Sequence, residues 1–243
     1  MDERFVRTRM LLGNDAMAVL NASRVAVFGI GGVGGYVVEA LARSGVGALD
    51  LIDNDTVCLS NLNRQIIATQ DSLDRYKVDV AAERVASIAP DCRVRTYQTF
   101  FLPENAAEFD FSAYDYVADC IDTVAGKIAL VMHAREAGTP IISAMGTGNK
   151  LDPTMLEVGD LSETSVCPLA RVMRRELRRR GVEHLKVLWS REEPLTPLES
   201  CTEETGANGS KRRAIPGSTA FVPSAGGLII AGEIVRELTR TKK

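Results

Sequence analysis

The chain is predicted to adopt an α/β fold built on a doubly wound, mostly parallel sheet, with a C-terminal elaboration that contains some antiparallel strands. Two observations carry this prediction. Short apolar runs with strand character alternate with segments of helical periodicity through about residue 146. The first of these runs leads into a glycine-rich turn that opens a helix, which is how a βαβ unit begins. In such a sheet, ligands bind outside the carboxyl ends of the strands.

The elements of the first part follow from periodicity and from the glycine and proline residues between them. A segment that mixes polar and apolar residues predicts an N-terminal helix over 4–20. Strands are then expected at 24–28, 48–52, 92–99, 116–121 and 141–144. Helices are expected between them at 33–44, 75–88 and 124–137.

The alternation changes after residue 149. We expect strands at 155–158 and 187–189, helices at 168–180 and 224–238, and a long mobile loop at about 192–217. No clean linker interrupts the chain, so residues 1–243 are predicted to form a single domain. Its parts are an N-terminal helical segment (1–22), the alternating part (23–150) and a C-terminal part (151–243).

Composition and charge limit the classes of protein to which the chain can belong. The chain has 243 residues, of which 45% are hydrophobic and 25% charged, as in a soluble globular protein with a full core. The net charge of −3 favours no polyanion, so an RNA partner would need a local basic patch. The apolar run at 225–231 is far shorter than the roughly 20 residues that span a bilayer, so we expect no membrane association.

The N-terminus and the cysteines indicate a cytoplasmic protein. The first ten residues are charged and lack the apolar stretch of a signal peptide. The five cysteines are widely spaced and form no C-x-x-C pair, which is typical of reduced thiols and argues against a structural zinc site.

A glycine-rich turn follows the first predicted strand. Gly29, Gly31 and Gly34 form the pattern G-x-G-x-x-G, with Gly32 inside it, and Asp53 ends the next strand about 20 residues on. Glycines there let the backbone approach phosphates at a helix N-terminus, and the acid can bind ribose hydroxyls. The pattern predicts a Rossmann-like nucleotide site within 23–150. The alternative is tight helix–strand packing without a ligand, and the pattern does not separate a nicotinamide or flavin enzyme from an ATP user.

A dense polar run follows the second strand. Its members are Asp53, Asp55, Ser60, Asn61, Asn63, Arg64 and Gln65. A guanidinium such as that of Arg64 can clamp phosphate oxygens, while Ser60 and Asn61 can orient the ribose or the phosphates. Lys77 stands near the start of the next helix, where its ammonium can neutralise a triphosphate. The alternative is a solvated loop with a helix cap at Ser60 or Asn61.

Asp122 follows the strand expected at 116–121, at the edge of the sheet where active groups gather. One carboxylate together with substrate phosphates is the usual way in which proteins hold Mg²⁺, so Asp122 is a candidate metal ligand. The alternative is an N-cap for the helix at 124–137. Asp119 lies within the strand, and we interpret it as structural.

Together these residues resemble the ATP site of the ubiquitin-activating-type adenylyltransferases, which include the activating enzymes for molybdopterin synthase and for the thiamine sulfur carrier. The resemblance covers roughly residues 4–146 and implies ATP as the nucleotide. Its matching positions are Gly29–Gly34, Asp53, the S-N-L-N-R-Q run at 60–65, Lys77 and Asp122. It also implies a homodimer in which Arg7 of one subunit enters the partner's site; the alternative is a surface arginine.

Three further stretches resemble one branch of that superfamily, the tRNA threonylcarbamoyladenosine dehydratases. They are 145–154, 167–178 and the run from 216 to 228. The resemblance implies an adenylating ligase that dehydrates and cyclises threonylcarbamoyladenosine in tRNA, by activating its carboxylate with ATP before an intramolecular ring closure. One alternative is adenylation of a ubiquitin-like sulfur-carrier protein, although the missing C-x-x-C pairs count against it. More remote alternatives are an NAD-dependent oxidoreductase and a nucleotide-sensing module.

The helix expected at 168–180 carries four arginines at i, i+3, i+4 and i+7, which share one face. They are Arg171, Arg174, Arg175 and Arg178, and we expect them to point outward as a tRNA-binding ridge. The alternative is a solvated face paired with Glu163, Glu176 or Glu183. The basic residues 211–213 offer further RNA contacts. Cys167 and Cys201 are interpreted as bystanders, and a sulfur-relay protein is a further partner that the resemblance allows.

Overall fold

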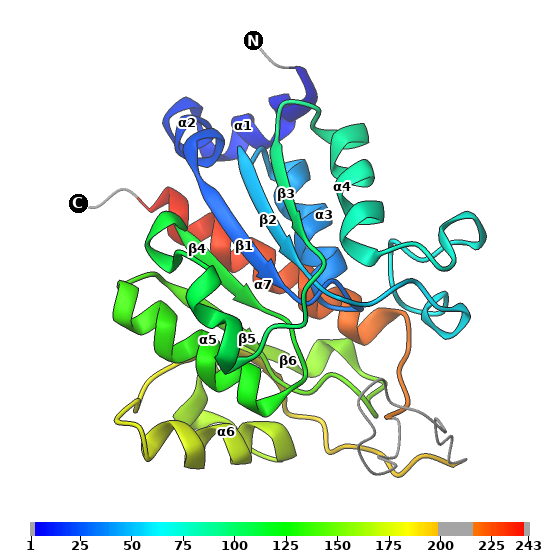
Figure 1. Ribbon diagram of the computed structural model, residues 1–243, viewed down its shortest axis with the longest axis vertical. Coiled ribbons are helices and arrows are strands. Elements are labelled where there is room, and N and C mark those ends of the chain that lie inside the picture. Colours follow the sequence, from blue (N-terminus) through cyan, green and yellow to red (C-terminus); the bar gives the residue numbers. More distant parts are fainter. Residues whose placement is uncertain (1–2, 199–215, 241–243) are drawn as a thin grey trace.

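The computed structural model describes residues 3–198 and 216–240. Its sheet has the strand order β3-β2-β1-β4-β5-β7-β6 (Figure 1). The strands are β1 (Arg24–Phe28), β2 (Ala48–Ile52), β3 (Arg93–Tyr97), β4 (Tyr116–Asp119), β5 (Ile141–Ala144), β6 (Leu156–Asp160) and β7 (Lys186–Ser190). Neighbouring strands are parallel except for β6 and β7, which are antiparallel. The predicted fold class is therefore confirmed.

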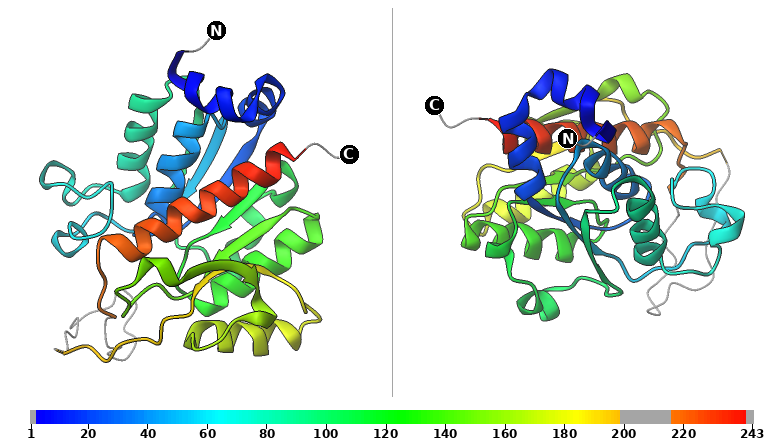
Figure 2. Two further views of the ribbon diagram at one scale, coloured as in Figure 1. Left: turned by 180° about the vertical axis from the view of Figure 1, so that it is seen from behind. Right: turned by 90° about the horizontal axis from the view of Figure 1, so that it is seen from above.

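Helices cover both faces of this sheet (Figure 2). On one face lie α2 (Asn14–Ala22), α3 (Gly34–Ser44), α4 (Lys77–Ile88) and α7 (Phe221–Thr239); on the other lie α5 (Val124–Ala137) and α6 (Pro168–Arg178). The alternation of β1 explains this layering, because successive side chains point to opposite faces. Val25 and Val27 are buried among residues of α3 and α7, whereas Ala26 and Phe28 are buried against α5 and a cluster of aromatic rings.

Short 3-10 helices fill several connections. They are η1 (Glu3–Phe5), η2 (Leu59–Asn61), η3 (Gln70–Ser72), η4 (Pro103–Glu108), η5 (Phe111–Ala113), η6 (Pro153–Met155) and η7 (Leu161–Glu163). No helix among the described residues is both long enough and apolar enough to cross a membrane.

The predicted N-terminal helix over 4–20 is wrong in its continuity. After η1 the chain forms α1 (Val6–Leu12), and Gly13 then separates it from α2. Gly13 has φ +85°, a backbone conformation that ends a helix and that glycine adopts without a steric penalty. The C-terminal helix begins three residues earlier than 224, because Pro223 is tolerated in a first helical turn, where its missing N–H breaks no bond.

Part of the predicted loop at 192–217 can be assessed. Residues 192–198 and 216–217 have no helix or strand, as expected, while 199–215 lie outside the described residues. The predictions for Cys201 and for the basic residues 211–213 therefore fall outside the described part as well.

A fully buried ion pair joins the middle of the sheet to α5. Lys127 Nζ donates to Asp119 Oδ1 at 3.0 Å and to the Ala144 carbonyl oxygen at 2.7 Å, and both charged side chains are 0% exposed. Ser143 donates to the second carboxylate oxygen of Asp119. The structural interpretation of Asp119 agrees with this network, which holds the carboxyl ends of β4 and β5 together.

Candidate nucleotide-binding site

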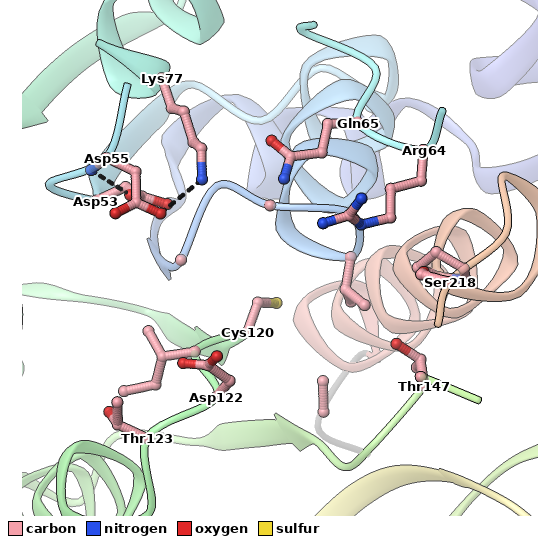
Figure 3. A pocket seen from close by; sticks show the side chains of 18 of the residues that line it. Asp53, Asp55, Arg64, Gln65, Lys77, Cys120, Asp122, Thr123, Thr147 and Ser218 are labelled. Atoms are coloured by element: carbon pink, nitrogen blue, oxygen red, sulfur yellow. Dashed lines mark hydrogen bonds and ion pairs between the residues drawn. The ribbon is translucent and has the colours of Figure 1, made fainter. Parts of the chain in front are cut away.

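A cavity of about 530 Å³ opens at the carboxyl ends of β1 and β4, where the winding of the sheet reverses direction. Polar side chains from several segments face it (Figure 3). Its walls are the glycine turn after β1, the loop after β2, the start of α4, the loops after β4 and β5, and Pro216, Ser218 and Pro223. Segments far apart in the sequence therefore meet at one ligand-sized space.

Three of the four predicted glycines line the cavity, namely Gly29, Gly31 and Gly32. A Cβ on Gly31 would meet only the Gln65 amide, at 3.9 Å, so its missing side chain leaves room on the cavity side. Gly34 differs, because a Cβ there would lie 1.8 Å from the carbonyl oxygen of Gly29. The tight packing that we gave as the alternative thus applies to Gly34 and also to Gly29, where a Cβ would lie 2.8 Å from the Cys120 backbone, while Gly31 leaves backbone open to a ligand.

Asp53 and Lys77 lie close together on one side of the cavity (Figure 3). Asp53 accepts hydrogen bonds from the N–H groups of Ile30 at 2.6 Å and Asp55 at 2.8 Å. Burial raises the pKa of Asp53, and the nearby Lys77 ammonium partly offsets that rise. The Lys77 side chain is only 7% exposed, and its Nζ donates to Asp55 Oδ2 at 2.7 Å. A cation so little solvated interacts strongly with a phosphate placed beside it.

Arg64 and Gln65 come from the loop that follows β2 (Figure 3). Arg64 is half-buried, which lowers the pKa of its guanidinium, and its Nη1 donates to the carbonyl oxygen of Ser60 and to Asn63 Oδ1, each at 2.9 Å. Gln65 is buried, and its Oε1 has no hydrogen-bond partner among the described residues. Buried polar atoms are nearly always satisfied in native structures, so this oxygen is left for a polar ligand or an ordered water.

Asp122 lines the cavity with an exposed side chain. The alternative of an N-cap is wrong, because Thr123 holds the N-cap position of α5. Within the described ranges, no three His, Cys, Asp or Glu side chains are close enough to hold a metal ion together. The donor set nevertheless fits Mg²⁺, which usually takes one or two carboxylates and completes its shell with substrate phosphates and water.

Three of the predicted residues have other placements. The Ser60 side chain is exposed and does not line the cavity, although its carbonyl oxygen holds Arg64. Asn61 lines the cavity, but its Oδ1 accepts the N–H of Cys58 at 3.1 Å, so it has the capping role that we gave as the alternative. Arg7 is exposed on α1, at the opposite end of the strands from the cavity (Figure 1).

Sequence reasoning missed one wall of the cavity. Thr147, beyond the carboxyl end of β5, carried a positional signal, because ligands gather at such ends. Ser218 lies in a stretch that carries the family resemblance, but that stretch gives no position for it, since only the packing of residues 216–218 against the loop after β5 brings it to the cavity. Phe100, 38% exposed at the cavity, was likewise not identified.

The four predicted arginines of α6 are only partly exposed to solvent. Arg171, Arg175 and Arg178 are exposed. The outward orientation predicted for Arg174 is wrong, because it is half-buried and its Nη1 donates to the carbonyl oxygen of Thr164 at 2.7 Å and to the hydroxyl of the same residue. Glu176 pairs with Arg175 at 3.1 Å, so the solvated, paired face that we gave as the alternative applies to that residue.

A glycine turn, a strand-end acid and a set of cations around one crevice define a nucleotide-binding α/β protein of the adenylating class. The model of the ThiF family matches residues 5–243, and the chain belongs to that family.

Relatives and solved structures agree with this membership. The chain is 39% identical over 244 residues to a tRNA threonylcarbamoyladenosine dehydratase of Bacillus subtilis, covering 99% of this chain and 96% of the relative. It is 42% identical over 176 residues to the Escherichia coli enzyme of the same name, covering 72% and 66%. The crystal structure of E. coli tRNA N6-threonylcarbamoyladenosine dehydratase in complex with ATP superimposes with a TM-score of 0.86 at 33% identity, covering 97% of this chain and 93% of that one.

Proposed function

We propose that this protein catalyses the ATP-dependent dehydration of threonylcarbamoyladenosine in tRNA. The observation that carries the proposal is the cavity at the switch point of the sheet, where Arg64, Lys77 and Asp122 surround an open glycine turn. The relatives with the same fold and nearly the same length carry that activity in their names. A tRNA substrate also makes the cytoplasm the expected compartment.

The chemistry follows from the substrate. A carboxylate is a poor electrophile, because its oxygen is a poor leaving group. In the proposed reaction, a carboxylate oxygen of the modification attacks the α-phosphorus of ATP and expels pyrophosphate. A nitrogen of the same modification then attacks the activated carbonyl carbon, loses its proton and expels AMP. The ring closes with net loss of water, whose oxygen leaves in AMP, and positioning supplies much of the rate because the second step is intramolecular.

The cavity side chains have distinct parts in this scheme. Arg64 and Lys77 stabilise the negative charge that develops on the phosphates, and Asp53 orients the ribose. Asp122 would hold Mg²⁺ with the phosphate oxygens, and the ion would neutralise charge on the expelled pyrophosphate. Gln65 Oε1, which has no partner among the described residues, accepts a hydrogen bond from the bound substrates.

The decisive experiment is mass analysis of tRNA nucleosides after incubation of the protein with ATP, Mg²⁺ and tRNA that carries the modification. The proposal expects a nucleoside lighter by one water, together with AMP and pyrophosphate. Unchanged nucleosides would contradict it. Pyrophosphate exchange that requires a ubiquitin-like carrier protein instead of tRNA would favour the sulfur-carrier alternative.

The exposed arginines of α6 are proposed to bind the tRNA backbone. Arg171 and Arg178 are exposed and, unlike Arg175, are not paired with Glu176. Replacing either by alanine is expected to weaken tRNA binding for all sequences alike and to reduce the slope of log K against log salt by about 0.7–0.9. Arg95→Ala, on the edge strand β3 at the other side of the sheet, is the matched control. An unchanged salt slope in both α6 variants would contradict this assignment.

A homodimer is proposed from the N-terminal helices. Met10 is 79% exposed and Leu11 87% exposed on α1, and such side chains on a short helix are suited to a subunit interface. The same helix carries Arg7, which would enter the partner's cavity because its own cavity lies at the other end of the sheet.

Mixed dimers test this arrangement. Arg7→Ala and Lys77→Ala subunits are each expected to be inactive alone. Mixing and re-equilibrating them should restore activity, because the heterodimer contains one cavity with both an intact Lys77 and an intact partner Arg7. Turnover by tRNA dehydration is the measurement, and mixing two preparations of Lys77→Ala is the control. No recovery in the mixture, with heterodimers detected by mass spectrometry, would refute the shared site.

A further inference from the structure

Two polar residues of the cavity, Thr147 and Ser218, have no part in the nucleotide site described above. Thr147 and Ser218 lie on the same side as Arg64 and away from Asp53 and Lys77 (Figure 3). Both are half-buried, and within the described ranges neither side-chain hydroxyl takes part in a hydrogen bond with the protein. Two unpaired hydroxyls facing one end of a cavity are suited to a polar ligand group.

Residues 147–149, which follow β5, and residues 216–218 form one continuous surface on this side of the cavity. We call this surface the acceptor wall. Gly217 N–H donates to Asn149 Oδ1 at 2.6 Å, and Asn149 N–H donates to the Gly217 carbonyl oxygen at 2.7 Å. Gly148 allows this close packing, because a Cβ there would lie 2.9 Å from Pro216. The two halves of the wall, about 70 residues apart in sequence, are therefore held together by a pair of hydrogen bonds.

Asn63 joins the acceptor wall to Arg64. Its Nδ2 donates to the Ser218 carbonyl oxygen at 3.0 Å, and its Oδ1 accepts a hydrogen bond from Arg64 Nη1 at 2.9 Å. One amide thus holds the guanidinium and the wall in a fixed relation. A displacement of the acceptor wall would therefore change the orientation of the Arg64 guanidinium.

We propose that the acceptor wall binds the carboxyl-bearing nucleoside of the RNA substrate through the hydroxyls of Thr147 and Ser218, and that Asn63 is a positioning residue that sets Arg64 for that substrate. This inference rests on the proposed function. The attacking carboxylate must reach the α-phosphorus, so its subsite has to border the phosphate-binding Arg64, as the acceptor wall does through Asn63. A modified nucleoside with hydroxyl and carboxylate groups matches two hydroxyls that both donate and accept.

The first test removes the hydroxyls one at a time with Thr147→Val and Ser218→Ala. Each variant is expected to raise the KM for modified tRNA by roughly 2- to 10-fold, the range for one lost hydrogen bond, and to leave the Kd for ATP unchanged. Ser87→Ala, an exposed hydroxyl on α4 outside the cavity, is the matched control.

Three outcomes would overturn the proposal. The first is an unchanged KM for modified tRNA in both variants. The second is a loss of ATP affinity as large as the loss of affinity for tRNA. The third is that the two substitutions weaken binding of a carrier-protein tail instead of binding of tRNA. Failure of the wild-type protein to dehydrate tRNA would refute the proposed function instead, so the two failures are distinguishable.

The second test isolates Asn63. Asn63→Ala is expected to lower kcat by about tenfold with little change in the Kd for ATP, because Arg64 loses one of the two groups that orient it. In an Arg64→Ala background the same substitution should have no further effect. Equal losses in both backgrounds would show that Asn63 acts independently of Arg64 and would overturn its positioning role. Melting temperatures of the variants separate this effect from unfolding.

Discussion

Lys77→Ala is expected to lower the turnover number by about 10²–10³, the usual cost of removing one preorganised electrostatic group from an active site. The Lys77 side chain is 7% exposed, so its charge is weakly screened. Without it, Asp53 and Asp55 would face the phosphates uncompensated, and their repulsion would add to the loss. Steady-state kinetics with modified tRNA and ATP measure the effect.

The matched control is Arg75→Ala, two residues earlier in the chain. Arg75 is exposed, does not line the cavity and pairs with Glu83 on the surface, where an ion pair contributes little. Its loss should leave turnover within about twofold, which corresponds to less than 1 kcal/mol. If Lys77→Ala were as active as Arg75→Ala, the assignment of the phosphate site would be wrong.

Lys127→Met is expected to destabilise the fold by about 3–5 kcal/mol, because it leaves the Asp119 carboxylate buried without a counter-ion. For a chain of this length, each kcal/mol lowers Tm by about 2–4 °C, so a fall of roughly 6–20 °C is expected in thermal unfolding. The affected network lies directly beneath the loops that carry Asp122 and Thr147, so activity should fall together with stability.

Two comparisons sharpen this experiment. Replacing both partners, with Asp119→Leu and Lys127→Met, should recover part of the stability, because no unpaired charge remains. Arg236→Ala removes an exposed arginine whose partner, Glu233, keeps its ion pair with Lys186, and it should change the free energy of unfolding by no more than about 1 kcal/mol. A Lys127→Met protein as stable as the wild type would show that the buried ion pair contributes nothing net.

The sequence predicted the central elements well where local signals agree. β1, β2, β5 and α5 have the predicted bounds, because apolar runs there are bordered by glycine, proline or charged residues. The break at Gly13 was missed, since isolated glycines are tolerated inside helices and only the observed φ shows that this one ends α1. Similarly, helical spacing placed Arg174 on one face with the other arginines of α6. Spacing carries no information about Thr164, whose carbonyl oxygen accepts a hydrogen bond from the Arg174 guanidinium and keeps it half-buried.

By itself, the sequence determined the α/β class, the glycine turn and the inventory of cations and carboxylates, because strand, turn and helix signals act over a few residues. Only the tertiary structure decided which of these groups meet. The register of parallel strands brings Gly29 beside Cys120, and the return of the chain after β7 sets Ser218 against Asn63. Such contacts join residues about 90 to 155 positions apart, and they depend on packing free energy summed over the whole core, which no local pattern encodes.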